Sequence, residues 1–142
     1  AFTIKAGFTT TAPTAGEVLT VNGSKTVTWT TAGTVGTVNL YYSTNDFATE
    51  TLITVTPATN TGSYAWTVPD AISSNVKIKV ADADAGHPAS NTITPAFTIK
   101  AGLGITAPTS GEILTVNNSK TLTLTGLVSD GHQLQRAGVK TS

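Results

Sequence analysis

The chain has 142 residues, of which 11% are charged, with eight basic and eight acidic side chains and no cysteine. This balanced charge lacks the basic footprint of a nucleic-acid-binding protein, so we expect no nucleic-acid partner. The absence of cysteine excludes a disulfide framework, a thiolate metal site and a cysteine nucleophile. No apolar run is long enough to insert into a membrane.

Short segments in which apolar and polar residues alternate, each closed by Gly, Pro, Asn or Asp, predict about seven β-strands and no helix. In chain order these segments are GEVLTV (16–21), KTVTWTT (25–31), TVNLYYS (37–43), ETLITVT (50–56), SYAWTVP (63–69), NVKIKVAD (75–82) and PAFTIKA (95–101). The apolar faces of these segments carry the candidate core residues Val27, Trp29, Leu40, Tyr64, Trp66, Val68, Ile78 and Phe97. The pattern predicts an all-β fold, an immunoglobulin-like antiparallel β-sandwich.

Residues 96–126 repeat residues 1–31 at an offset of 95, with 22 of 31 positions identical, which indicates a tandem repeat. We therefore divide the chain into the last strand of a preceding repeat (1–7), a complete Ig-like domain (8–102), the opening strands of a following repeat (103–126) and a divergent tail (127–142). The tail is interpreted as a strand cap, a processing remnant or an appended sequence. Arrays of near-copies are typical of proteins that build length or many equivalent surfaces.

Few residues suggest a metal site or a catalytic site. Asp82 and Asp84 are candidate calcium ligands at a strand end, but a full site needs about six to eight oxygens, and a solvated loop is the alternative. His87 and His132 lack the paired spacing of a zinc site and are expected in exposed loops. The sequence shows neither a G-x-S-x-G elbow nor a groove with paired carboxylates, so we expect no catalytic residues, no cofactor and no enzyme activity.

Two surface features are candidate sites for binding or attaching a sugar. Tyr41 is expected to face outward, where its ring could stack on a glycan or make a cross-strand contact without a ligand. Asn22-Gly23-Ser24 and Asn117-Asn118-Ser119 are N-glycosylation sequons at the same repeat position, which makes Asn22 and Asn117 candidate glycosylation sites. Such triplets also arise by chance in a chain rich in serine and threonine.

The order TAPTAGEVLTVNGSKTVTWTT, GTVNLYYSTND, NTGSYAWTVPD, NVKIKVADAD and PAFTIKAG resembles the Ig-like repeats of large bacterial surface proteins. It is also similar to the Ser/Thr-rich Ig-like module of fungal cell-wall proteins associated with β-glucan assembly. The resemblance covers residues 8–102 and part of 103–126. It implies a packing role, and no catalytic one, for Val27, Trp29, Tyr64, Trp66, Val68 and Pro69.

These observations lead us to expect a structural repeat of a secreted or cell-surface rod, stalk or fibre. Its partners would be other copies, adjacent repeats or cell-wall and surface glycans. Because segments 1–7 and 103–126 are unfinished copies, we expect filaments assembled by strand complementation between copies. The alternative is a carbohydrate-binding or adhesin module of a cell-surface protein.

Overall fold

The computed structural model describes residues 1–87, 89–125 and 137–140. The chain divides into two compact units, Ala1–Lys100 and Ala101–Ser142. Every regular element in the described residues is a β-strand, and the strands of the first unit form two sheets. The predicted all-β, immunoglobulin-like β-sandwich is thereby confirmed for that unit.

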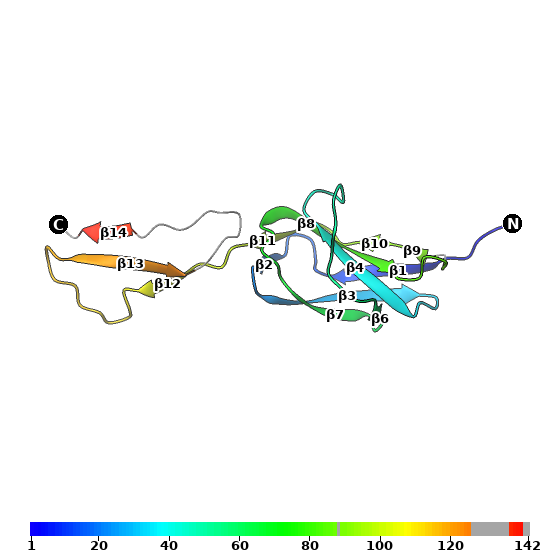
Figure 1. Ribbon diagram of the computed structural model, residues 1–142, viewed down its shortest axis with the longest axis horizontal. Coiled ribbons are helices and arrows are strands. Elements are labelled where there is room, and N and C mark those ends of the chain that lie inside the picture. The colour runs from blue at the N-terminus through cyan, green and yellow to red at the C-terminus, as the bar shows by residue number, and fades with distance from the viewer. Residues whose placement is uncertain (88, 126–136, 141–142) are drawn as a thin grey trace. The chain divides into compact units, whose positions relative to one another are not determined.

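The first sheet has the strand order β7-β3-β1-β9 (Figure 1). Its long central strand β3 (Ser24–Ala32) pairs antiparallel with β1 (Ala6–Ala12) on one side and with β7 (Ser63–Thr67) on the other. The two-residue strand β9 (Ala89–Ser90) adds to β1 in parallel. β3 is rich in β-branched threonine and valine, which suits an extended backbone with one wet and one dry face.

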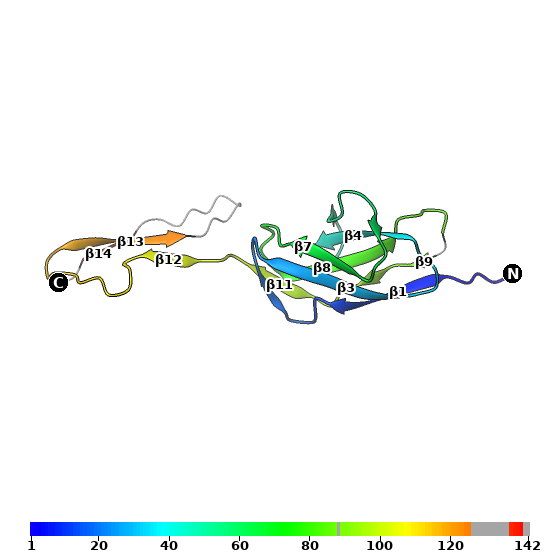
Figure 2. The same ribbon diagram turned by 90° about the horizontal axis from the view of Figure 1, so that it is seen from below.

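The second sheet is built around the longest strand, β8 (Ser73–Asp82), and can be followed in Figure 2. β8 pairs antiparallel with β4 (Thr37–Ser43) and with β11 (Phe97–Lys100), and β2 (Val18–Thr20) runs parallel to β11. Three short strands complete this sheet: β5 (Thr51–Leu52) and β6 (Ala58–Thr59) on β4, and β10 (Thr92–Ile93) on β8. The first two strands of the unit thus belong to different sheets, β1 to the first and β2 to the second.

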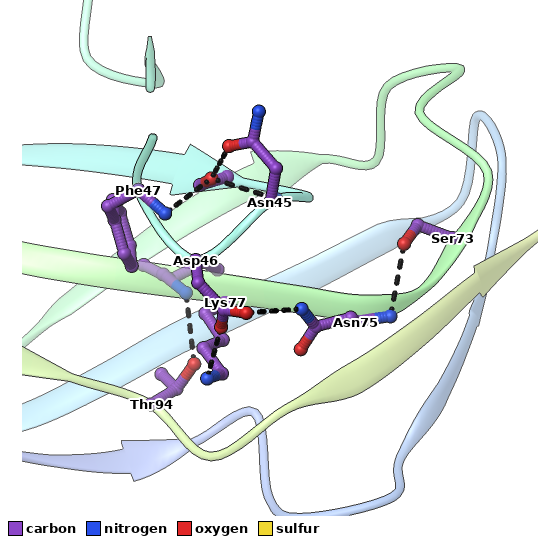
Figure 3. A network of polar contacts seen from close by, with 9 residues as sticks. Asn45, Asp46, Phe47, Ser73, Asn75, Lys77 and Thr94 are labelled. Atoms are coloured by element: carbon purple, nitrogen blue, oxygen red, sulfur yellow. Dashed lines mark hydrogen bonds and ion pairs between the residues drawn. The ribbon is translucent and has the colours of Figure 1, made fainter. Parts of the chain in front are cut away.

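Two buried threonines complete the pairing where the edge strands are interrupted. The Thr94 hydroxyl accepts a hydrogen bond from the Ile78 backbone N–H at 2.9 Å (Figure 3), while the Thr94 backbone N–H donates to the Ile78 carbonyl. The Thr54 hydroxyl likewise lies 3.4 Å from the Leu40 backbone N–H, while the Leu40 carbonyl accepts from the Ile53 backbone N–H at 2.7 Å. Each hydroxyl takes the place of a strand carbonyl, so a buried N–H keeps its partner.

The core lies between the two sheets and contains most of the predicted residues: Val27, Trp29, Leu40, Trp66, Val68, Ile78 and Phe97 are all buried. Phe8, Val35, Val38, Val76, Val80 and Ile99 join them. Tyr64 differs from the expectation, because it is only half-buried and packs against the margin of this cluster. The alternation on β7 gives the correct face of Tyr64, but the strand is at the edge of its sheet and leaves the ring partly open.

The beginning of the chain also differs from the expectation. Residues 1–5 form no strand, and Ala6 and Gly7, which we assigned to a preceding repeat, belong to β1. The strand β1 itself was not among the predicted strands. Its sequence, AGFTTTA, offers one large apolar residue and no clear alternation, so pairing with β3 defines it rather than its own pattern.

The second unit contains β12 (Gly104–Ala107), β13 (Ser119–Thr125) and β14 (Ala137–Lys140) in the order β12-β13-β14. β12 pairs with β13 at Gly104↔Thr125, Ile105↔Leu124 and Ala107↔Thr123. These pairs reproduce Thr9↔Thr30, Thr10↔Trp29 and Ala12↔Thr28 of β1 and β3 at the offset of 95, including the register shift between the last two pairs. Residues 104–125 therefore share backbone pairing, as well as sequence, with residues 9–30.

The strand β14 lies within the divergent tail. It pairs antiparallel with β13 from Ser119↔Lys140 to Leu122↔Ala137. At the offset of 95, these positions on β13 are those that β7 occupies on β3, from Ser24↔Thr67 to Val27↔Tyr64. The strand cap that we considered for the tail is consistent with this pairing of residues 137–140.

Candidate functional site

Tyr41 lies on β4, on the face of the second sheet that points away from the core. The ring is half-buried, because the Lys79 ammonium lies over it at 4.7 Å from the ring centroid and at 5.3 Å from the centroid of Phe47. Lys79 also forms an ion pair with Glu50. One face of the Tyr41 ring therefore already holds a cation from its own sheet, so that face offers no open surface on which a sugar could stack.

The loop after β4 holds Phe47 in this position. Asp46 and Phe47 both have left-handed backbones, with φ values of 55° and 62°, which cost non-glycine residues about 1 kcal/mol or more each. The Ser43 hydroxyl compensates by accepting hydrogen bonds from the backbone N–H groups of Asn45, at 3.2 Å, and Phe47, at 3.0 Å (Figure 3). The loop is thus fixed by the last residue of the preceding strand.

The Asp46 carboxylate anchors the same loop to β8. One oxygen lies 2.6 Å from the Lys77 ammonium and the other accepts from the Asn75 side-chain amide at 3.1 Å (Figure 3). The Lys77 hydrogen bond, followed by that from Asn75, holds the pKa of Asp46 below its ordinary value. Because the pair is exposed, it contributes little to stability, and its main effect is to position the loop.

The two candidate calcium ligands bind their own loop. One Asp82 oxygen accepts from the Asp84 backbone N–H at 2.9 Å, and the other lies 2.6 Å from Nδ1 of His87. Asp84 in turn accepts from the Gly86 backbone N–H at 3.0 Å. Among residues 1–87, 89–125 and 137–140, no group of three or more His, Asp or Glu side chains is placed to hold a metal ion.

The pairing of His87 with Asp82 was not predicted. Burial acts to raise the pKa of Asp82, but the hydrogen bonds from the Asp84 backbone and from His87 together outweigh it and lower the pKa. The signal was present in the sequence, since the two residues lie five positions apart in a loop rich in glycine and alanine. His132, the other histidine, lies outside the described residues.

Asn22 and Asn117 occupy the same turn in the two units. Both are exposed and both have left-handed backbones, with φ values of 63° and 68°. Each turn is flanked by an ion pair, Glu17 with Lys25 in the first unit and Glu112 with Lys120 in the second. In each pair the hydrogen bond from the lysine lowers the pKa of the glutamate most. The backbone N–H of Thr14, or of Thr109 in the second unit, also donates to the glutamate and lowers its pKa further. The exposed tip of each turn leaves the asparagine amide accessible to modification.

No protein-family model and no curated protein matches the chain. One solved structure, titled "Structures of Clostridium thermocellum CbhA fibronectin(III)-like modules", is similar with a TM-score of 0.40 and 21% identity. The match covers 87% of this chain, and the chain spans 64% of the length of that structure. The described residues include no helix that is long and apolar enough to cross a membrane.

Proposed function

We propose that this chain is a structural repeat of a secreted or cell-surface rod, stalk or fibre, without enzyme activity. The observation that carries the proposal is the agreement between the two units: the second copy keeps the strand register, the register shift, the left-handed asparagine and the Glu–Lys pair of the first. A scaffold built of repeated units requires that such features be kept together in each copy.

The substitutions between the copies support the same conclusion. Val27 becomes Leu122 and Phe8 becomes Leu103, so these apolar positions stay apolar, and the threonines at 26, 28 and 30 around Val27 are retained at 121, 123 and 125.

The proposed mode of assembly is strand complementation between copies. Residues 1–5, AFTIK, are identical to residues 96–100, which contain β11. Phe97 and Ile99 are each 1% exposed in that strand, whereas the equivalent Phe2 and Ile4 are 87% and 80% exposed. The second unit exposes 62% of Leu103, although the equivalent Phe8 is 8% exposed. Phe2, Ile4 and Leu103 therefore lack the contacts that bury the equivalent Phe97, Ile99 and Phe8 in the first unit.

The first unit gives the register for such a contact. There, β11 runs parallel to β2 with the pairs Thr98↔Val18, Ile99↔Leu19 and Lys100↔Thr20. Transferred to two copies, the pairs become Thr3↔Ile113, Ile4↔Leu114 and Lys5↔Thr115. Burial of Phe2 and Ile4 would contribute about 3–6 kcal/mol, close to the lower range of the cost of association, which begins at about 4 kcal/mol. Assembly is therefore expected at high protein concentration.

Analytical ultracentrifugation of the 142-residue chain, with electron microscopy of the concentrated sample, tests the proposal. We expect concentration-dependent oligomers that appear as filaments. The double substitution Phe2→Ser with Ile4→Ser should abolish them, whereas Thr3→Ser, the matched control on the same segment, should not. A monomer at every concentration, or a double variant that assembles like the original chain, would contradict strand complementation.

A further inference from the structure

An open groove lies at one margin of the first unit, between the two sheets. It is formed where β7, the last strand of the first sheet, faces β5 and the adjoining end of β4 in the second. The groove has a volume of about 410 Å³, and its lining includes Tyr42, Thr51, Leu52, Tyr64, Trp66 and Thr67. We call it the edge groove. The alternation of the strands predicts the faces of these residues but not that they meet at one margin.

The rings of the edge groove are held in place by the core. Trp66 forms the buried floor, with its ring 5.8 Å from that of Tyr42 at an interplanar angle of 41° and 6.4 Å from that of Phe97 at 84°. Tyr42 and Tyr64 are half-buried, so each keeps part of its surface open. Because these side chains are already ordered, a ligand that stacks on them pays little further conformational entropy.

The polar groups of the groove carry no charge. None of the lining residues is Asp, Glu, Lys, Arg or His, whereas Tyr42, Tyr64 and Thr51, which pairs with Tyr42, carry hydroxyl groups. An ionic ligand would find no counter-charge there, which disfavours phosphate, sulfate and nucleic acid. In addition, β7 is an edge strand, so one side of its backbone is not paired within its sheet. The groove thus combines aromatic surface with neutral hydrogen-bonding groups.

We propose that the edge groove binds a neutral glycan chain. A pyranose ring has an apolar face of C–H bonds that stacks on an aromatic ring, and it has hydroxyl groups at its rim that both donate and accept hydrogen bonds. Tyr64 and Tyr42 provide the stacking surface, and the exposed Thr51, which pairs with Tyr42, provides a hydroxyl group beside it. This site goes beyond a structural role, because each complete repeat of a fibre would present one glycan contact.

The test uses the full chain and neutral hexasaccharides, namely cellohexaose, laminarihexaose, xylohexaose and maltohexaose, with heparin as the charged probe. Isothermal titration calorimetry measures binding, and fluorescence of the Trp29→Leu variant, in which Trp66 is the one remaining tryptophan, reports occupation of the groove floor. We expect saturable binding of at least one neutral hexasaccharide and no binding of heparin at this site. Tyr64→Ala should weaken binding by about tenfold or more, the loss of one aromatic contact.

Two further variants keep the test independent of folding. Thr51→Arg changes an exposed residue of the groove lining that pairs with Tyr42, adds bulk and charge without removing a core contact, and should abolish binding. Tyr41→Ala, the matched control on β4, removes a tyrosine outside the groove and should leave affinity unchanged. Failure of all four neutral sugars to bind, equal binding by Thr51→Arg, or a preference for heparin would overturn the proposal. Loss of self-association in Thr51→Arg without any sugar binding would also overturn it, since the groove would then hold a second copy.

Discussion

Trp29 is the residue at which the packing of the first unit can be tested most directly. Its side chain is 3% exposed on β3, and its indole N–H donates to the Asn60 side-chain oxygen at 2.8 Å. The Asn60 amide in turn donates to the carbonyl of Val35 at 3.1 Å, and the Asn60 backbone N–H donates to that of Gly36 at 3.0 Å. The ring therefore fills the core and also joins the first sheet to the connection between β3 and β4.

The loss of stability expected on replacing Trp29 follows from this environment. Replacing a buried tryptophan by alanine costs about 3–5 kcal/mol through lost burial and the cavity that remains. A unit of this size has a total stability of about 5–15 kcal/mol, so Trp29→Ala should remove a large share of it. With a shift of about 4 °C or more for each kcal/mol, the Tm should fall by at least about 12 °C. Trp29→Phe keeps an aromatic ring and loses the indole hydrogen bond, so its cost should be nearer about 1–2 kcal/mol.

Urea unfolding followed by tryptophan fluorescence separates the two units. Both tryptophans of the chain lie in the first unit, so Trp66 still reports its unfolding when Trp29 is replaced. Trp29→Leu, which introduces the residue found at the equivalent position 124, should fall between the Phe and Ala variants. The reasoning would be refuted by a Trp29→Ala variant within about 1 kcal/mol of the original chain, or by a Trp29→Phe variant as unstable as Trp29→Ala.

Two solution predictions concern the charged loops. Added EDTA should change the free energy of unfolding by less than about 0.3 kcal/mol, because Asp82 and Asp84 already bind their own loop; a lower Tm in EDTA that calcium restores would contradict this. Acid should remove the contribution of Asp46, whose pKa Lys77 and Asn75 lower in the folded state. This contribution is complete above the unfolded pKa of about 4 and is lost as the pH falls through the folded pKa. Urea titrations from neutral pH to about pH 2 should therefore show a smaller acid loss in Asp46→Asn, and an identical loss would exclude the effect.

The sequence predicts best those strands whose side chains alternate along their whole length. On β8, Val76, Ile78 and Val80 alternate with Lys77 and Lys79, and the structure buries the first three. The alternation has a period of two and depends only on the strand itself. In contrast, β1 and the two-residue strands depend on neighbours far along the chain, and a local pattern carries no information on those neighbours.

The candidate sites were harder to predict because their residues come from different strands. The exposure of Tyr41 depends on Lys79, which β8 places beside it, and the period-two pattern of β4 cannot indicate that an ammonium group will cover the ring. The edge groove similarly combines Tyr42 of one sheet with Tyr64 of the other. Only the open margin of the sandwich brings them together. The Asp82–His87 contact is local, and its short spacing could have indicated it.

The parallel pairing of β2 with β11 determines how the first unit bears mechanical load. These strands lie near the two ends of the unit and run in the same direction, joined along Val18–Thr20 and Thr98–Lys100. Tension that pulls the beginning of the unit away from its end therefore draws the strands past one another and strains their hydrogen bonds together, instead of opening them one at a time. Resistance to such force is governed by the rate of unfolding. In the proposed fibre, we expect this short parallel contact to resist extension together with the pairing of β1 and β3, which precedes it in the chain.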